Sequence, residues 1–370
     1  MQFYGKTKIC YGPYALDTLE ELPASHAFVV TDAFMVKSGF ADQIMSHLER
    51  KGIGLTVFDA VEPDPSLATV TRGAASFLQC GADLVVALGG GSAIDAAKAI
   101  TYFAQKARGE EGKKALLVAI PTTSGTGSEV TSISVVTDTV NEVKIPLNDE
   151  LLIPDVAILD ARFTRTMPPH VTAATGMDVL THAIEAYTSR YSNAFTTIFA
   201  EQAIRYVFTY LHRAYCQMDD MRARDSMLVG SCMAGMAFNN SGLGITHSIA
   251  HSLGGLFHIP HGLANAILLP HVILFNSFDA GVKYREISAF LGLPASTVEE
   301  GTASLHKAVC DLNASMGIAA RLRELKKMEE TVFLKHLDMM ASNALQDMCT
   351  ASNPRRPSHE DICSLLRRVW

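Results

Sequence analysis

The chain has 370 residues, of which 48% are hydrophobic and 19% are charged, and its formal net charge is −7. This length exceeds what one hydrophobic core usually serves, so we expect two domains. The composition excludes a disordered chain, and a mildly acidic sequence without a Lys/Arg stripe argues against a nucleic-acid partner.

Short apolar strands alternate with helical patterns in the first half of the chain. Such alternation is typical of a parallel sheet covered by helices on both faces. The expected strands are Ala27–Thr31, Ile53–Phe58, Leu84–Leu88 and Ala115–Ile120, and the clearest helical patterns are Phe40–Lys51 and Ser66–Cys80. We therefore expect an α/β, Rossmann-like nucleotide-binding domain over residues 1–164.

The second half of the chain carries helical patterns without strands. A proline pair, Pro168 and Pro169, interrupts the pattern where the change occurs. The expected helices cover residues 176–189, 195–211, 222–238 and 245–253. We therefore expect an all-α, metal-binding and catalytic domain over residues 165–370.

Three consecutive glycines, Gly89, Gly90 and Gly91, follow the strand Leu84–Leu88 and precede an apolar-periodic helix. Residues without side chains let a pyrophosphate approach the positive N-terminus of such a helix. The alternative is a tight turn capped by Ser92, with Asp95 three residues later. The pattern is not G-x-G-x-x-G, so the ordinary Rossmann fingerprint is absent, but we favour phosphate binding.

Two further features point to a nucleotide. The segment 121–130, rich in Thr, Ser and Gly, follows a buried strand, and its hydroxyl and N–H groups can surround a ribose or phosphate; a generic polar loop is the alternative. Asp32 follows the first strand, where a carboxylate can accept hydrogen bonds from ribose hydroxyls and repel a 2′-phosphate, which favours NAD over NADP. A helix cap at Asp32 remains the alternative.

The cysteines and the apolar stretches exclude several other classes of protein. Seven cysteines are scattered singly without C-x-x-C spacing, so we expect unpaired thiols in a reducing cytoplasm, and any metal must be bound by His and carboxylate side chains. No secretory signal is visible and no run of about 18 apolar residues is uninterrupted, so we expect no membrane partner.

A set of histidines and one aspartate predicts a metal site in the helical half. Asp178 and His182 are four residues apart, so both project from one face of a helix. A lone pair of this kind is usually a surface hydrogen bond, but five of the 13 histidines lie close together in the later sequence, at positions 247, 251, 258, 261 and 271. Imidazole and carboxylate ligands suit Fe(II), Zn(II), Co(II) or Mn(II) without choosing among them.

Taken in chain order, these motifs resemble the iron-containing (group III) alcohol dehydrogenases over essentially the whole chain, including Asn353-Pro354-Arg355. The Asp-x-x-x-His-Ala-x-Glu segment matches at Asp178 to Glu185, and the His-x-x-x-His…Pro-His-Gly segment matches at His247 to Gly262. The resemblance implies Fe(II), with Zn(II) as the alternative, bound by Asp178, His182, His247 and His261. It also implies that the catalytic residue His251 lies beside the nicotinamide, where we suggest that it relays a proton.

On the cofactor side, the resemblance implies NAD bound by Asp32, Gly89, Gly90, Gly91, Ser92, Asp95, Thr122, Thr123, Thr126 and Lys144. Two positions depart from the family. Asp64 stands where the family often has Asn, and Ile133 stands where some members place a polar cofactor contact. Both departures weaken these two positions as cofactor contacts and leave the metal set unchanged.

The segments 176–182 and 258–266 look most like the 1-propanol and ethanol dehydrogenases of bacterial propanediol and ethanolamine microcompartments. The resemblance implies an NAD-linked enzyme that interconverts a short-chain primary alcohol and its aldehyde. It also implies a homodimer or higher homo-oligomer, with microcompartment shell proteins as further partners. Glycerol, lactaldehyde and 1,3-propanediol dehydrogenases, a dehydroquinate-synthase-like lyase and a non-catalytic nucleotide-binding protein remain alternatives. A fourth ligand, His182, and the lack of an Arg/Lys cluster near the metal motifs argue against the lyase.

Overall fold

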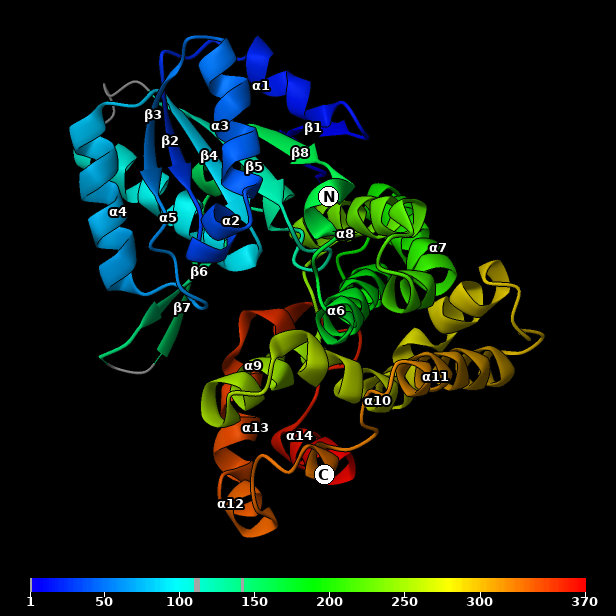
Figure 1. Cartoon of the computed structure of the whole chain (residues 1–370). Coiled ribbons are helices and arrows are strands. Elements are labelled where there is room, and N and C mark those ends of the chain that lie inside the picture. The colour runs from blue at the N-terminus through cyan, green and yellow to red at the C-terminus, as the bar shows by residue number, and fades with distance from the viewer. Residues whose placement is uncertain (1, 110–113, 141–142) are drawn as a thin grey trace. The chain divides into compact units, whose positions relative to one another are not determined.

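The computed structural model describes residues 2–109, 114–140 and 143–370. These residues form two compact units, shown as ribbons in Figure 1. The α/β unit comprises Tyr4–Met167 together with Arg224–Gly235, and the helical unit comprises Pro168–Ala223 and Met236–Trp370 with a short N-terminal segment ending at Phe3. The α/β-then-helical architecture expected from the sequence is confirmed.

The α/β unit is built on a parallel sheet of six strands. The strand order across the sheet is β1-β8-β5-β4-β2-β3, and every pair is parallel. The strands are β1 (Lys8–Tyr11), β2 (His26–Val30), β3 (Gly54–Phe58), β4 (Leu84–Gly89), β5 (Leu116–Pro121) and β8 (Val156–Leu159). β2 to β5 match the expected strands, and the four-residue strands β1 and β8 complete the sheet on one side.

Helices cover both faces of this sheet because successive strand residues point to opposite sides. On β4, Leu84, Val86 and Leu88 pack in the core that contains α1 and α3, whereas Val85 and Ala87 pack in the core that contains α4 and α5. The helices of this unit are α1 (Thr18–Glu21), α2 (Ala33–Lys37), α3 (Phe40–Arg50), α4 (Leu67–Cys80) and α5 (Gly91–Arg108). The all-apolar strands are therefore buried on both faces, as a parallel sheet requires.

A separate antiparallel hairpin, β6 (Ile133–Asp138) and β7 (Val143–Asn148), packs beside α5. The buried ammonium of Lys98 on α5 holds it there by donating to the carbonyl oxygens of Thr131 and Ile133, each at 2.9 Å. This hairpin was not among the expected elements.

The strand order changes direction between β2 and β4. From β2 the chain adds β3 on one side and then crosses back to place β4 on the other side. Ligands of open α/β sheets bind at the carboxyl ends of the strands that flank such a switch point. Here those ends lead into Asp32 and into the glycines 89–91.

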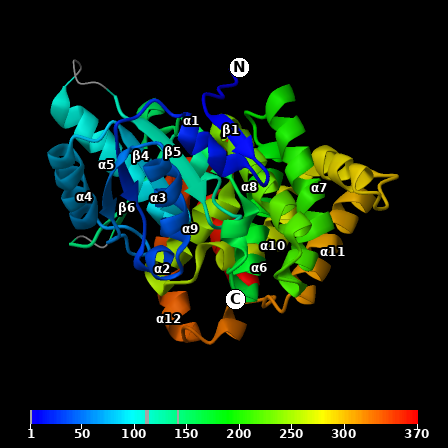
Figure 2. The ribbon, with the colours of Figure 1, turned by 45° about the horizontal axis from the view of Figure 1, so that its top comes forward.

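The helical unit contains no strand among its described residues. Its helices are α6 (Pro169–Thr188), α7 (Ala194–Cys216), α8 (Met221–Ser241, whose middle belongs to the α/β unit), α9 (Ile245–Phe257), α10 (His261–Phe290), α11 (Val298–Ser315), α12 (Glu330–Lys335), α13 (Leu337–Gln346) and α14 (His359–Val369). One apolar core joins α9, α10, α12, α13 and α14. The helices α10 and α11 lie side by side in both Figure 1 and Figure 2.

Two helices of this unit are apolar on almost every side. Residues 176–188 of α6 are all buried. α10 has the length and the apolar composition to cross a membrane, but 67% of its apolar window is buried within the protein. Helices that are hydrophobic all round are typical of the interior of a large domain, and any charged group on them must have a partner.

Candidate functional site

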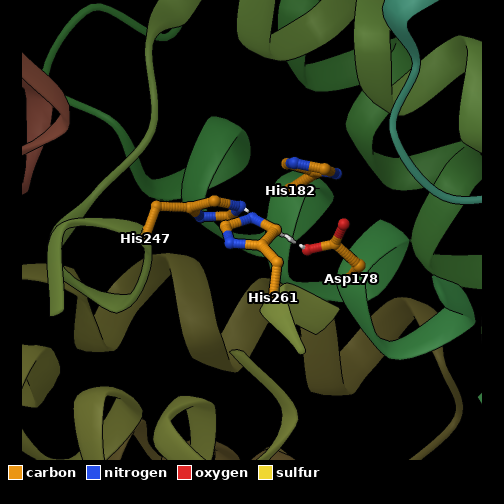
Figure 3. A group of neighbouring side chains, drawn as sticks. All are labelled: Asp178, His182, His247 and His261. Atoms are coloured by element: carbon orange, nitrogen blue, oxygen red, sulfur yellow. Dashed lines mark ion pairs between the residues drawn. The ribbon is translucent and has the colours of Figure 1, made fainter. Parts of the chain in front are cut away.

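Asp178, His182, His247 and His261 meet in the helical unit, although 83 residues separate the first from the last (Figure 3). One possible ligand atom from each lies within 4.8 Å of those of the others. The Nε2 atoms of His247 and His261 are each 3.7 Å from Asp178 Oδ1, and the rings of His182 and His247 stack with centroids 4.6 Å apart. The structure thus brings together all four of the expected metal ligands.

Three ligand-bearing helices supply this cluster. α6 carries Asp178 and His182 one turn apart, and it buries both among largely apolar residues. α9 carries His247 in its first turn, and α10 begins at His261. His182 also stacks on Phe238 of α8, with ring centroids 4.5 Å apart, and this contact helps to hold the imidazole ring in place.

The start of α10 can approach α6 closely because residue 262 is glycine. A Cβ atom at Gly262 would lie 2.3 Å from the carbonyl oxygen of Ala174 and 3.3 Å from the Cβ of Asp178. Any side chain would therefore push the two helices apart. The Pro-His-Gly triplet combines a proline as helix N-cap, a ligand at the first helical position and the only residue that permits contact with α6.

A second carboxylate holds the α9 ligand in place. Glu185, on the same helix as Asp178, accepts a hydrogen bond from His247 Nδ1 at 2.6 Å. Glu185 also accepts from the backbone N–H groups of Gly244 and Thr246, at 2.8 and 2.7 Å, where α9 begins. Backbone N–H groups at a helix start attract an anion, so Glu185 is anchored there and turns the Nε2 atom of His247 toward Asp178.

Asp178 is oriented in the same way by an amide. Asn265, one turn after His261 on α10, donates from Nδ2 to Asp178 Oδ1 at 2.7 Å, and the same nitrogen lies 3.1 Å from His261 Nε2. Asn265 is fully buried. It therefore fixes two of the four candidate ligands relative to each other.

The electrostatics of the cluster favour a cation. Burial alone would raise the pKa of Asp178, but the nearby His182, His261 and His247 hold it well below its ordinary value. Burial opposes the charged form of His247, yet Glu185 and Asp178 outweigh it and raise the pKa of His247 to about 9. Positive charge is therefore stabilised at His247, beside an Asp178 carboxylate that stays ionised.

The donor set fits the divalent metal that the resemblance implies. His247 Nε2 is buried without a hydrogen-bond partner among the described residues, which is costly unless a ligand completes the site. One carboxylate and three imidazoles suit Fe(II) or Zn(II). His258 and His271, the other two of the clustered histidines, do not belong to this group of side chains.

His251, one turn after His247 on α9, lies at the edge of the cluster. Its ring stacks on that of His261, with centroids 5.2 Å apart and planes inclined by 14°. Its Nδ1 atom is 2.8 Å from Asp347 Oδ2. The side chain of His251 is 43% exposed, so it connects the buried cluster with the surface.

The glycine turn of the α/β unit has the geometry of a bare helix N-terminus. α5 begins at Gly91 with Gly90 as its N-cap, and no side chain caps it, so the alternative of a Ser92 cap is not realised. A Cβ atom at Gly90 would lie 3.2 Å from Thr123 Cγ2, and one at Gly91 would lie 2.7 Å from Thr126 Cγ2. The glycines therefore also let the Thr-rich segment 121–128 pack against the helix start.

Some of the other expected cofactor residues of the α/β unit already form hydrogen bonds or ion pairs within the protein. Asp95 is half-buried, with Ser128 Oγ at 2.6 Å and the Val135 N–H at 3.0 Å on its two oxygens, so it ties α5 to the hairpin. Lys144 on β7 forms an exposed ion pair with Asp64 at 2.6 Å. Thr122 is buried, and its backbone N–H donates to the Gly89 carbonyl.

Asp32 caps a helix with one carboxylate oxygen and directs the other toward the glycine turn. It caps α2, because its Oδ1 atom accepts from the N–H groups of Phe34 and Met35 at 2.8 and 3.0 Å. Its other oxygen faces the glycine turn, since a Cβ at Gly89 would lie 3.6 Å from Oδ2. One oxygen thus remains at the switch point of the sheet.

Three residues that hold the metal ligands or His251 in place were not assigned a role in the sequence analysis. Glu185 lies in the motif that pointed to the family, and its spacing of seven from Asp178 could have placed it on the same face of α6. Asn265 could have been found by its spacing of four from His261. Asp347 is 96 residues from His251, and no local pattern connects the two.

Comparison with known proteins identifies the family. The sequence model of the Fe-containing alcohol dehydrogenase family, C-terminal, matches residues 172–370, and that of iron-containing alcohol dehydrogenase matches residues 6–161. The NADPH-dependent butanol dehydrogenase of Clostridium saccharobutylicum is 41% identical over 100% of this chain and 98% of the relative. The 1-propanol dehydrogenase PduQ of Citrobacter freundii is 40% identical over 98% of each chain.

A solved structure of 1,3-propanediol oxidoreductase superposes with a TM-score of 0.93 at 35% identity, covering 100% of this chain and 99% of that one. With matches of this extent and four candidate ligands assembled in one cluster, the chain belongs to the iron-containing alcohol dehydrogenase family and is an oxidoreductase.

Proposed function

We propose that this protein is an NAD-linked, iron-dependent enzyme that interconverts a short-chain primary alcohol and its aldehyde. The observation that carries the proposal is the cluster of Asp178, His182, His247 and His261, whose donor atoms lie within 4.8 Å of one another and of which only His261 is exposed. A divalent metal bound there would act as a Lewis acid on the alcohol or aldehyde oxygen. Nicotinamide would supply the hydride chemistry.

The residues of the chain position these groups. Glu185 and Asn265 hold the ligand side chains in place before the metal arrives, which limits the reorganisation that binding requires. The four ligands carry one negative charge in total when the three imidazoles are neutral. With a divalent metal the site is net positive and favours an anionic oxygen.

His251 is the proposed proton relay. The Nδ1–H group of His251 donates to Asp347 Oδ2, which leaves the lone pair of Nε2 free to accept a proton. Stacking on His261 keeps the ring next to the cluster, and its exposed edge reaches solvent. Asp347 therefore acts as a positioning residue that sets the tautomer and orientation of this ring.

The preference for NAD rests on Asp32. The carboxylate oxygen of Asp32 that does not cap α2 would repel a 2′-phosphate and accept hydrogen bonds from a ribose. The relatives differ in their names, since one is an NADPH-dependent butanol dehydrogenase and another is an NAD-dependent methanol dehydrogenase of Bacillus methanolicus. The chain's own Asp32 therefore supports NAD.

Short-chain primary alcohols are supported by the relatives named for butanol, 1-propanol and methanol. We further propose a homo-oligomeric enzyme, which sedimentation of the purified protein would test. Association with microcompartment shell proteins stays a prediction, and co-purification with an isolated shell would test it.

The first experiment is anaerobic oxidation of NADH with propanal as acceptor. It compares metal-free, Fe(II)-loaded and Zn(II)-loaded protein, and each assay is repeated with NADPH. We expect turnover with Fe(II) and NADH, little with NADPH, and a relative gain for NADPH in Asp32→Ala. Silence with every short aldehyde, in protein shown to bind both metal and NAD, would contradict the proposal and favour a lyase or a non-catalytic protein.

A further inference from the structure

A second group of metal-ligating side chains lies near the C-terminus, outside the catalytic cluster. It consists of Asp338 on α13 and of His359 and Cys363 on α14. The three donor atoms lie within 4.8 Å of one another. Asp338 and His359 are at the surface, whereas Cys363 is only 1% exposed. A cation could therefore arrive from solvent and bind a sulfur atom at the protein boundary.

The two distances from the sulfur atom are close to those between ligands of one zinc ion. Cys363 Sγ is 3.6 Å from His359 Nδ1 and 3.8 Å from Asp338 Oδ1. Bond lengths of about 2.3 Å to sulfur and about 2.0–2.2 Å to nitrogen or oxygen, at a tetrahedral angle of about 109°, place such pairs roughly 3.5–3.6 Å apart. Both distances need only a few tenths of an ångström of adjustment.

The other nitrogen of the imidazole is already fixed. His359 Nε2 is 3.2 Å from the backbone carbonyl oxygen of Asp338, so Nε2 carries the proton and the lone pair of Nδ1 faces the sulfur. Metal-ligating histidines usually donate their second N–H to a carbonyl or carboxylate in this manner. His359 is also held by the start of α14, where Ser358 and Asp361 form a capping box.

Two other His/Cys pairs in the chain have the same helical spacing and serve as a comparison. His212 and Cys216 on α7, and His306 and Cys310 on α11, have the same spacing of four and S···N distances of 3.6 and 3.7 Å. Neither pair belongs to a group of three metal-ligating side chains in the part of the chain that the structure describes. The α14 pair alone gains a carboxylate from a second helix.

We propose that Asp338, His359 and Cys363 form a binding site for a divalent transition metal of the Zn(II) or Co(II) class, separate from the catalytic centre. Water would complete the four-coordinate shell. As the metal–sulfur bond forms, the Cys363 thiol releases its proton to solvent, so the two anionic ligands and the neutral imidazole balance the charge of the cation.

Such a metal would fasten α13 to α14. The segment between these helices contains Asp347, the partner of His251, so the site stabilises the element that carries this residue. Burial and the charge of Asp338 raise the pKa of the Cys363 thiol, which disfavours a free thiolate and hence a redox role. The site is therefore expected to be structural.

Cobalt spectroscopy tests the site without interference from the catalytic centre. The catalytic cluster contains no sulfur, so a thiolate-to-Co(II) charge-transfer band reports only a cysteine ligand. Full-length protein already loaded with its catalytic metal is titrated anaerobically with Co(II). We expect the band to saturate at about one equivalent of added Co(II) at micromolar concentrations, within the affinity range of protein metal sites.

Variants identify the residues that bind the metal. Cys363→Ser should abolish the charge-transfer band, whereas the matched control Cys310→Ser should retain it. Asp338→Ala should weaken Co(II) binding by at least the ~10–100-fold that is seen when groups that only orient ligands are lost. Turnover with NADH should be preserved in Asp338→Ala. If Cys363→Ser fails to fold, the loss of Co(II) affinity in Asp338→Ala still tests the site.

Cys349 lies in another group of possible ligands, with His251 and Asp347, and provides the alternative source of sulfur. The proposal is overturned if the band is absent, needs millimolar Co(II), survives Cys363→Ser, or disappears in Cys349→Ser instead.

Discussion

The metal centre and the glycine turn are built on opposite principles. The metal centre consists of one carboxylate and three imidazoles, most of them buried, and further polar groups orient several of them, as Glu185 does for His247. The glycine turn depends on the absence of side chains, because Gly90 and Gly91 leave room both for a ligand and for the Thr123–Thr126 segment. Sequence spacing therefore reveals the first kind of site more directly than the second.

This difference predicts how each site fails. Loss of one metal-centre side chain removes a ligand or leaves a charge unbalanced in a buried environment, which is costly. Substitution in the glycine turn instead adds atoms and displaces its neighbours. We expect the first kind of change to affect metal content and turnover together, and the second to affect nucleotide affinity alone.

The largest effect is expected from His261→Ala. Removal of this ligand should reduce metal content to near zero and lower kcat by on the order of 10³-fold, at least the scale seen when a main electrostatic contributor to catalysis is lost. Metal analysis and NADH turnover check this result. His271→Ala, on the same helix but outside the cluster, is the control. A fully metallated and active His261→Ala protein would show that His261 is not a ligand.

A smaller effect is expected from Glu185→Gln. Glutamine retains an acceptor for the start of α9 but loses the charge that orients His247, so metal affinity should fall by about 10–100-fold. Competition with a chelator measures the change. The exposed Glu201→Gln, which removes only a surface pair with Arg205, should leave metal affinity unchanged. Equal metal affinities in the unsubstituted protein, Glu185→Gln and Glu201→Gln would contradict a supporting role for Glu185.

Gly91→Ala should weaken nucleotide binding without affecting the metal. The new Cβ would lie 2.7 Å from Thr126 Cγ2, so the loop must move, and we expect roughly tenfold weaker NADH binding, or about 1.4 kcal/mol. Fluorescence titration with NADH measures this change. Thr126→Ser removes the obstructing methyl group and should partly restore affinity in the double variant. Unchanged affinity in Gly91→Ala would argue against phosphate binding at this turn.

The smallest effect concerns a buried acid that follows the Thr-rich segment. Burial raises the pKa of Glu129 to about 7 from its ordinary 4.5, with Lys98 nearby as a partial counter-charge. Between these pH values the folded chain binds more protons than the unfolded chain, so its stability falls as pH rises through this window.

Glu129→Gln removes this pH-dependent cost. Glu129 Oε1 has no hydrogen-bond partner among the described residues, so the neutral amide should be tolerated. We expect a gain in unfolding free energy on the order of 1 kcal/mol at pH 8 and almost none at pH 4.5. Thermal unfolding at the two pH values measures the difference. An equal gain at both values would mean that ionisation is not its cause.

The sequence by itself was sufficient for the four strands β2 to β5, for the all-helical second half and for the placement of Asp178 and His182 on one helix face, whereas the full set of candidate metal ligands came from the family resemblance. Strands such as Leu84–Gly89 are continuous apolar runs between turns, and a helix of fixed period places Asp178 and His182 on one face whatever surrounds it. These properties depend on local sequence, so they can be read without knowing the fold.

Only the tertiary structure decided how distant segments support the site. Asp347 is paired with His251 across 96 residues, and Gly262 is required because α6 passes beside it. The same is true of Asp95, whose carboxylate binds Ser128 and Val135, and of the trio Asp338, His359 and Cys363. Such contacts depend on how helices and strands pack, and packing brings together residues that no local period relates.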